Sequence, residues 1–273
     1  MRPTSFVSRA SFVPPVSLAL LLPILVSSSL LAQGYRKVCP DAGVLPNELT
    51  QASDGTFYGT NAGGGNNLAG VVFKMDASCT RTIIHTFGDV MNEGQGPRGG
   101  LLVASDGFLY GTTASGGSDG VGTVFRMDTD GNNYSFTSIV RVQPGDLCPA
   151  TGIEPWCAPF QASDGNIYTS MENCGPGGAN GSSAGTVASI TPGLVVTGLS
   201  YFDPLGPATD LFYGLAEGPD HMLYGTAIHS DDVVHYGAVY KVPLGGGDPV
   251  VVHAFSRTDG ANPDSPVTFD SDG

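Results

Sequence analysis

Charged side chains, and basic ones above all, are scarce in this sequence. They make up 13% of the 273 residues, whereas a typical soluble domain has roughly 25%. Only 11 residues are lysine or arginine, against 25 aspartates and glutamates, so the formal net charge is -14. A surface with this balance repels phosphate backbones and anionic lipid headgroups. We therefore expect no nucleic acid among the partners of the protein.

Several short motifs of known enzyme classes are missing. The sequence has no HExxH pattern, no Gly-x-Ser-x-Gly elbow and no CxxC pair, which are signatures of metalloproteases, hydrolases and redox or zinc sites. The glycine-rich stretches at 63–67 and 175–181 lack the Lys-Ser/Thr of a P-loop. We assign no catalytic residue and no cofactor, and a non-catalytic role is favoured while enzymatic activity is left open.

Cysteine is also scarce. The five cysteines are Cys39, Cys79, Cys148, Cys157 and Cys174. In an oxidising compartment some of them should pair, and an odd number leaves one over. Cys148 and Cys157 bracket a short insertion that a local disulfide would close, and Cys157 with Cys174 is the competing pair.

Long hydrophobic runs are absent after the N-terminal region. The run at 16–32 follows Arg2 and Arg9 and leads into polar sequence, which is the pattern of a secretory signal peptide. We predict a signal peptide over residues 1–32, a lead segment over 33–44, and secretion or display at the cell surface without membrane insertion after signal cleavage. An N-terminal membrane anchor is the alternative, because the run is near the lower length for spanning a bilayer.

One seven-residue stretch recurs four times in a chain that is rich in glycine (40) and proline (20). The copies are DGTFYGT at 54–60, DGFLYGT at 106–112, DGNIYTS at 164–170 and DHMLYGT at 220–226. Their first residues stand 52, 58 and 56 positions apart, a period that indicates a tandem-repeat architecture. Asp272 and Gly273 begin a fifth copy, so we expect the sequence to be a truncated form of a longer array.

Other markers keep the same rhythm. A second marker occurs as GVVFKMD at 70–76, GTVFRMD at 122–128, GTVASIT at 185–191 and GAVYKVP at 237–243. Proline stands nine residues before the aspartate in three copies, at Pro97, Pro155 and Pro263. The repeat therefore extends over the whole unit and is not confined to the seven letters.

One unit, read from Gly99, contains four strand-like runs. Asp106 and Gly107 reverse an apolar run into FLYGTT, and after a polar loop the runs TVFRMD and YSFTSIV complete the unit. Four short antiparallel strands per repeat predict an all-β fold, a β-propeller-like array of four-stranded blades over residues 45–273, with four repeats and the start of a fifth. A parallel solenoid is the alternative.

The repeated residues are interpreted as structural. An aspartate in a turn can accept hydrogen bonds from nearby backbone amides, and a tyrosine at the same strand position in each copy is expected to share one packing role. These structural repeat residues are Asp54, Gly55, Tyr58, Asp106, Gly107, Tyr110, Asp164, Gly165, Tyr168, Asp220 and Tyr224.

The combination of GTVFRMD with a following DG, an aromatic-Phe-Gly segment, DGANP at 259–263 and SDGFLYGTT resembles the Gloeobacter/Verrucomicrobia repeat, or GloVer, of exported bacterial proteins. The resemblance covers the chain from about residue 45 to its end. It implies an extracellular tandem-repeat protein whose biochemical role is not established, and it supplies no catalytic residues. The third copy departs from the pattern, with Thr169 and Ser170 in place of Gly-Thr.

A few polar residues remain as candidates for a site. His229, Asp231, Asp232 and His235 form a weak metal-site candidate, and a solvated loop is the favoured interpretation. His85 and His253 occupy matching places in the repeat, which favours a structural role for them. The stretch DTDGNN resembles the start of an EF-hand, but Gly131 is misplaced and no glutamate closes the loop, so a hairpin turn is favoured.

The loops that follow the Tyr-Gly-Thr strands vary in length and composition. Variable loops on a constant scaffold commonly carry binding specificity. We therefore expect recognition or display outside the cell, with a glycan or a surface protein as partner and the ligand-binding residues unknown. A polysaccharide hydrolase or lyase on a propeller scaffold is the alternative, and it requires acidic or histidine side chains to meet in one pocket.

Overall fold

A computed structural model describes residues 47–65, 67–139, 154–172, 185–202, 208–228 and 236–270. The chain divides into a unit over 1–38 and a unit over 39–273, and all described residues belong to the second. The predicted signal peptide lies outside the described residues. In the part of the chain that the structure describes, no helix is long and apolar enough to cross a membrane.

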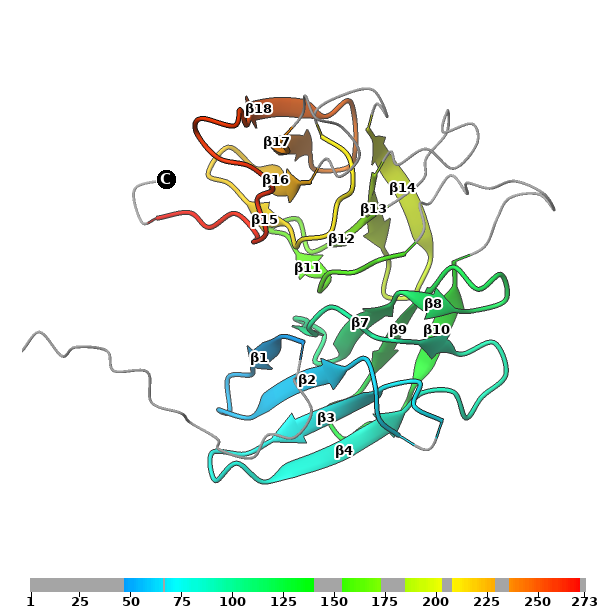
Figure 1. The fold of residues 1–273 in the computed structure, drawn as a ribbon. Coiled ribbons are helices and arrows are strands. Elements are labelled where there is room, and N and C mark those ends of the chain that lie inside the picture. The colour runs from blue at the N-terminus through cyan, green and yellow to red at the C-terminus, as the bar shows by residue number, and fades with distance from the viewer. Residues whose placement is uncertain are drawn as a thin grey trace, which may run out of the picture. The chain divides into compact units, whose positions relative to one another are not determined.

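Four four-stranded antiparallel sheets, here called blades 1 to 4, follow one another along the chain (Figure 1). Blade 1 consists of β1 (Leu49–Gln51), β2 (Phe57–Asn61), β3 (Val71–Met75) and β4 (Arg81–Thr86). Blade 2 consists of β6 (Leu102–Val103), β7 (Leu109–Thr113), β9 (Thr123–Met127) and β10 (Ser135–Ser138). Blade 3 consists of β11 (Phe160–Gln161), β12 (Ile167–Met171), β13 (Thr186–Ile190) and β14 (Val196–Tyr201). Blade 4 consists of β15 (Ala216–Glu217), β16 (Met222–Ala227), β17 (Ala238–Pro243) and β18 (Val250–Ala254).

Each blade joins its strands in the order of the sequence, and every pairing is antiparallel. A small two-stranded sheet of β5 (Gly94–Gln95) and β8 (Ser115–Gly116) is added beside blade 2. The described residues contain no helix. The predicted fold class, a β-propeller-like array of four-stranded antiparallel blades, is confirmed.

The repeated Asp-Gly forms the turn between the first and second strands of a blade. In blade 2, the Asp106 carboxylate accepts a hydrogen bond from the Phe108 amide at 3.1 Å, and Gly107 has a φ of 83°. The other three aspartates accept the equivalent amide bond at 2.9 to 3.3 Å. In the fourth copy, His221 occupies the glycine position and still has a φ of 57°. The turn interpretation of the aspartates therefore agrees with the structure.

Three of the repeated tyrosines pack between blades, and the fourth, Tyr224, packs on Phe269. Tyr58, Tyr110 and Tyr168 are at most 3% exposed, and Tyr224 is partly buried. The hydroxyl of Tyr168 also donates to the Asp164 carboxylate at 2.7 Å, a bond that recurs in the second and fourth copies. Each tyrosine thus has a packing role, as predicted, and in three copies it also supports the turn of its own blade.

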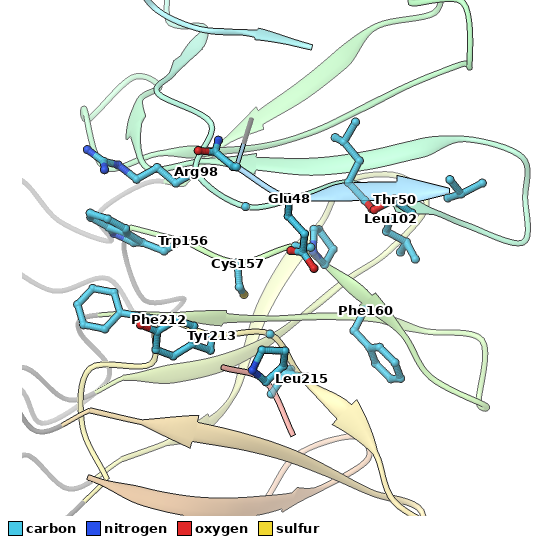
Figure 2. Close-up of a pocket in the computed structure, with 18 of the residues that line it drawn as sticks. Glu48, Thr50, Arg98, Leu102, Trp156, Cys157, Phe160, Phe212, Tyr213 and Leu215 are labelled. Carbon is cyan, nitrogen blue, oxygen red and sulfur yellow. The ribbon is translucent and has the colours of Figure 1, made fainter. Parts of the chain in front are cut away.

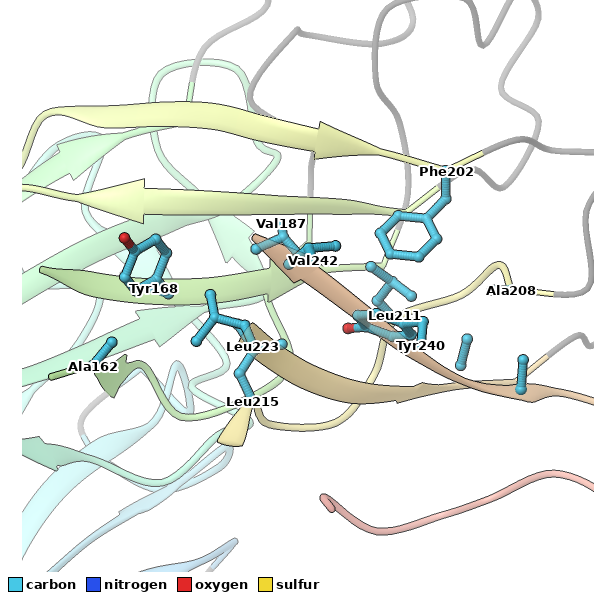
Figure 3. Close-up of a cluster of buried hydrophobic side chains, with 12 residues drawn as sticks. Ala162, Tyr168, Val187, Phe202, Ala208, Leu211, Leu215, Leu223, Tyr240 and Val242 are labelled. Carbon is cyan, nitrogen blue, oxygen red and sulfur yellow. The ribbon is translucent and has the colours of Figure 1, made fainter. Parts of the chain in front are cut away.

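Consecutive blades bury their hydrophobic faces against each other. Figure 3 shows the cluster between blades 3 and 4, where Tyr168 and Val187 of one blade meet Leu223, Tyr240 and Val242 of the other. Equivalent clusters join blade 1 to blade 2 and blade 2 to blade 3. Because burial of such side chains stabilises a fold by roughly 1.5–3 kcal/mol each, the packing of one blade on the next stabilises the array.

Candidate functional site: a cavity lined by the linking segments

Four short segments follow the four blades and share one backbone geometry, and the first three lead into the first strand of the next blade. These linking segments are residues 96–99, 154–157, 210–213 and 262–265. Their first residues all have left-handed backbone, with φ of 62°, 57°, 54° and 51°. Three of those four are not glycine, so the conformation is held by the surrounding structure against an intrinsic cost.

The second residue of each linking segment packs on a glycine of the preceding blade. This residue is the marker proline in three copies and Leu211 in the segment that links blade 3 to blade 4. A Cβ atom added to Gly122 would lie 3.1 Å from Pro155, and one added to Gly237 would lie 2.7 Å from Pro263. The glycine of the second sequence marker is therefore required for close approach between blades.

The fourth residue of each linking segment is held by a hydroxyl group of the preceding blade. Its backbone carbonyl accepts a hydrogen bond from the third residue of the Tyr-Gly-Thr motif. The four bonds run from Thr60 to Gly99 (2.7 Å), Thr112 to Cys157 (3.0 Å), Ser170 to Tyr213 (2.8 Å) and Thr226 to Ser265 (2.8 Å). The third copy, which departs from the motif in sequence, thus keeps the hydroxyl donor.

The third residue of each linking segment differs in every copy. It is Arg98, Trp156, Phe212 or Asp264. The residues on both sides of it are held to the preceding blade by packing and by a hydrogen bond, so this position can change without loss of those contacts. The first three of these side chains line a cavity of about 970 Å³ between the blades.

Residues of blades 1 to 3, of three linking segments and of the chain next to β15 and β16 of blade 4 line this cavity (Figure 2). The first strands contribute Thr50, Leu102 and Phe160, and Leu215 lies immediately before β15. Of the described parts of the variable loops, only Ile228 lines the cavity. The linking segments, and not those loops, therefore provide its most distinctive side chains.

Three of the lining side chains are joined by contacts with the ring of Trp156. The guanidinium carbon of Arg98 lies 4.1 Å from the centroid of the Trp156 ring. Phe212 meets the same indole edge to face, with ring centroids 5.4 Å apart and an angle of 89°. Trp156 is the single tryptophan of the chain. We call Arg98, Trp156 and Phe212 the aromatic wall of the cavity, which a bound molecule would contact.

Glu48 supplies the acidic group of the cavity. Its side chain is exposed, and Figure 2 shows its carboxylate pointing into the cavity. It is the only carboxylate among the described residues that line the cavity. Burial raises the pKa of the Tyr213 hydroxyl, and the charge of Asp264 raises it further.

The structure does not bring the repeated aspartates together. Asp54, Asp106, Asp164 and Asp220 lie one per blade, in turns at the sheet ends opposite the linking segments. The candidate metal residues His229, Asp231, Asp232 and His235 lie outside the described residues. No group of three or more potential metal ligands occurs among the residues that the structure describes.

The predicted disulfide between Cys148 and Cys157 does not form, and neither does the competing Cys157–Cys174 pair. Cys157 is a free cysteine and is buried. Its Sγ lies 3.1 Å from Ser170 Oγ of β12, in the blade that follows the linking segment. Cys79 is disulfide-bonded, with its partner outside the described residues.

The two periodic histidines make local contacts. His85 Nε2 lies 2.7 Å from the buried Glu93 carboxylate, which also accepts backbone hydrogen bonds from residues 88–90. His253 lies 3.3 Å from Asp259 at the surface. Both pairs hold the chain that leads to a linking segment, which agrees with the structural role predicted for these histidines. DTDGNN is likewise a hairpin turn, closed by amide bonds to Asp128.

Four-stranded blades joined by equivalent linking segments define a β-propeller-like repeat protein. The family model of the Gloeobacter/Verrucomicrobia repeat matches residues 45–273, and the chain belongs to this family. The search of curated proteins found no match.

Solved structures resemble the fold at low sequence identity. A protein of unknown function from Dyadobacter fermentans is 14% identical with a TM-score of 0.50, over 75% of this chain and 66% of that one. An endo-arabinase from Bacteroides thetaiotaomicron is 13% identical with a TM-score of 0.48, over 80% and 84% of the two chains. A family 117 glycoside hydrolase from Zobellia galactanivorans is 12% identical with a TM-score of 0.46, over 78% and 69%. The first similarity concerns the fold alone, and the other two support no inference about activity.

The residues of the aromatic wall occupy a regular position in the sequence, directly after each marker proline or Leu211. The marker prolines stand nine residues before the turn aspartates, and Leu211 stands at the same distance from Asp220. The residue after each of these prolines, and after Leu211, could therefore have been identified as a position that varies between otherwise similar repeats. Its exposure to a cavity could not, because that depends on how the blades pack.

Proposed function

We propose that the protein is an exported recognition protein that binds a glycan in the cavity between its blades. The observation that carries the proposal is the constant geometry of the linking segments around one varying residue, which is Arg98, Trp156 or Phe212 at the cavity. A rigid scaffold that presents different side chains at equivalent positions is suited to specific binding.

The chemistry of the cavity favours a sugar ligand. Aromatic rings such as Trp156 and Phe212 can contact the C–H faces of sugar rings, while Glu48, Thr50 and Gln51 can exchange hydrogen bonds with hydroxyl groups. The volume of about 970 Å³ is of the order of known small-ligand sites, roughly 300–1,000 Å³. A protein partner would need a broader contact, on the order of 800 Å² per side.

Export is supported by one feature of the sequence and one of the structure. The N-terminal residues have the pattern of a secretory signal peptide. The disulfide bond of Cys79 is typical of proteins that fold in an oxidising compartment. A glycan outside the cell would be accessible to a protein with these properties.

Polysaccharide hydrolysis has less support. Glycoside hydrolases commonly use a pair of carboxylates across the scissile bond, whereas Glu48 is the single carboxylate among the described lining residues. The repeated aspartates are already used by their turns and are distributed over the blades. We therefore favour binding without catalysis.

A glycan array with two variants tests the proposal. Phe212→Ala removes part of the aromatic wall, and Leu68→Ala removes an exposed side chain from a variable loop. We expect wild-type protein to bind one class of glycan, Phe212→Ala to bind it at least about tenfold more weakly, and Leu68→Ala to bind normally. An empty array, or loss of binding only in Leu68→Ala, would contradict the proposal. Thermal melting of both variants controls for unfolding.

A further inference from the structure

Arg98 carries a charge that its surroundings leave unpaired. Its guanidinium is exposed at the cavity and, within the described ranges, forms no ion pair or hydrogen bond. Lys74 and Lys241 behave differently, since each pairs with an aspartate, at 2.6 Å and 2.8 Å. Among the described residues that line the cavity, Arg98 is the single basic side chain, in a chain with a formal net charge of -14.

Contacts of both the backbone and the side chain position Arg98. The backbone of Arg98 lies between Pro97, which packs on Gly70, and Gly99, whose carbonyl accepts the Thr60 hydrogen bond. Its guanidinium lies over the Trp156 ring, with the guanidinium carbon 4.1 Å from the ring centroid. Stacking uses the face of the guanidinium and leaves its N–H edge available to a planar anion.

We propose that Arg98 binds the anionic group of an acidic oligosaccharide, either the carboxylate of a uronic acid or a sulfate ester. The proposal rests on the glycan-binding function proposed above and makes it specific. The guanidinium fork matches a carboxylate or an oxoanion in shape and charge, and such bidentate bonds are stronger than those between neutral groups. Arg98 is then the residue that determines specificity for a charged sugar.

Glu48 gives the ligand an orientation. Its carboxylate points into the same cavity and, in the described parts of the chain, accepts no hydrogen bond. It repels a second anion and accepts hydrogen bonds from sugar hydroxyls. The acidic sugar therefore lies over the Arg98–Trp156 stack, and a neighbouring neutral part of the ligand lies towards Glu48.

Binding can be followed through the emission of Trp156, the one tryptophan of the chain. The probes are oligogalacturonate and oligoalginate, each compared with its methyl ester, which keeps the sugar and removes the charge. Sulfated carrageenan oligosaccharides form a separate arm. The variants are Arg98→Gln, Arg98→Lys and, as a control of equal charge change outside the cavity, Arg257→Gln.

We expect at least one acidic oligosaccharide to bind at least about tenfold more tightly than its uncharged form. Arg98→Gln should lose this preference, Arg98→Lys should retain part of it because lysine lacks the planar fork, and Arg257→Gln should behave as wild type. Equal binding of charged and uncharged forms, or an unchanged preference in Arg98→Gln, overturns the inference but leaves the proposed function standing. Absence of binding to every glycan, neutral or acidic, overturns both.

Discussion

The hydroxyl group at the third position of each Tyr-Gly-Thr copy joins one blade to the next. Thr112 donates to the carbonyl of Cys157, and Ser170 donates to that of Tyr213 in the same way. Thr112 is 1% exposed, so its loss would leave a buried carbonyl without this donor. The hydroxyl, and not the identity of threonine, is what the position requires.

Replacing Thr112 tests this requirement. Thr112→Val keeps the shape of the side chain and removes the donor, and it should lower the free energy of unfolding by about 1–3 kcal/mol. Thr112→Ser keeps the donor and loses one methyl group, which should cost about 0.8 kcal/mol or less. Urea denaturation measures both. A Thr112→Val protein as stable as Thr112→Ser would show that the bond is unimportant.

The Asp164–Tyr168 pair makes stability depend on pH. Burial opposes ionisation of Asp164, but hydrogen bonds from the Tyr168 hydroxyl and the Asn166 amide outweigh it, so its pKa lies below the ordinary 3.8. Because this pKa is lowered on folding, the contribution to stability is complete above pH 3.8 and is lost as the pH falls through the folded-state value.

The variant Tyr168→Phe tests the origin of that shift. It removes the hydroxyl donor, so the pKa of Asp164 should rise towards 3.8, as measured by carboxyl NMR titration. The stability difference between the variant and the wild type should be larger at neutral pH than at pH values low enough to protonate Asp164 in both. An unchanged Asp164 pKa in Tyr168→Phe would assign the shift to another cause.

Sequence reasoning was most successful at the level of turn residues and least successful for cysteine. Asp106 and Gly107 have local roles, which a short stretch of sequence determines. Cys157 was assigned to a disulfide because of its distance along the chain from Cys148, yet its thiol lies against Ser170 of the next blade. A contact between a linking segment and the blade that follows it cannot be inferred from the spacing of two cysteines around one insertion.

Within three of the blades, a glycine of the second strand faces an aromatic residue of the third strand. Gly59, Gly111 and Gly225 each lie opposite an aromatic residue, namely Phe73, Phe125 and Tyr240. A Cβ atom on Gly59 would lie 2.8 Å from the Phe73 ring, so the ring covers the glycine. In blade 3 the facing pair is Thr169 and Ala188.

The third copy is therefore compensated and not merely eroded. Where the glycine is replaced by Thr169, the aromatic residue is replaced by Ala188, and the pair keeps the strands in register. In the sequence, Thr169 stands out as a departure from the repeated Tyr-Gly-Thr motif. The second change lies about twenty residues away, and its connection to the first appears only when the two strands are paired.

Transferring this exchange to blade 2 should show the coupling. Phe125→Ala alone should cost about 3–5 kcal/mol, and Gly111→Thr alone should also destabilise the protein because the new side chain meets the Phe125 ring. Gly111→Thr added to Phe125→Ala should cost less than Gly111→Thr added to the wild type, by at least about 1 kcal/mol. Denaturation of the four proteins provides the cycle, and strict additivity would refute the compensation.

The elements of the fold were largely predictable. The runs before and after Asp106 became β6 and β7, and TVFRMD contains β9. These strands follow from short-range patterns that repeat four times. The small β5–β8 sheet was not predicted, because its pairing of Gly94 with Gly116 depends on how the chain leaves blade 1 and has no alternating apolar pattern.

Across the whole described unit, the linking segments repeat one backbone arrangement in which only the third residue differs in every copy. Packing, a left-handed residue and one hydroxyl bond hold every linking segment in the same way. The residue between these fixed points differs in each copy, and three of the four line one cavity. The sequence indicated recognition but directed attention to the loops after the Tyr-Gly-Thr strands, since loops vary most visibly in length.

Hydrogen–deuterium exchange with and without saturating amounts of the best glycan from the array tests the central claim most directly. If the ligand binds between the blades, amide exchange should slow in the segments 98–103, 156–160 and 212–215, which line the cavity. The loops at 61–69 and 114–121 should exchange as in the free protein. Protection confined to those loops, with the three cavity segments unchanged, would contradict the account.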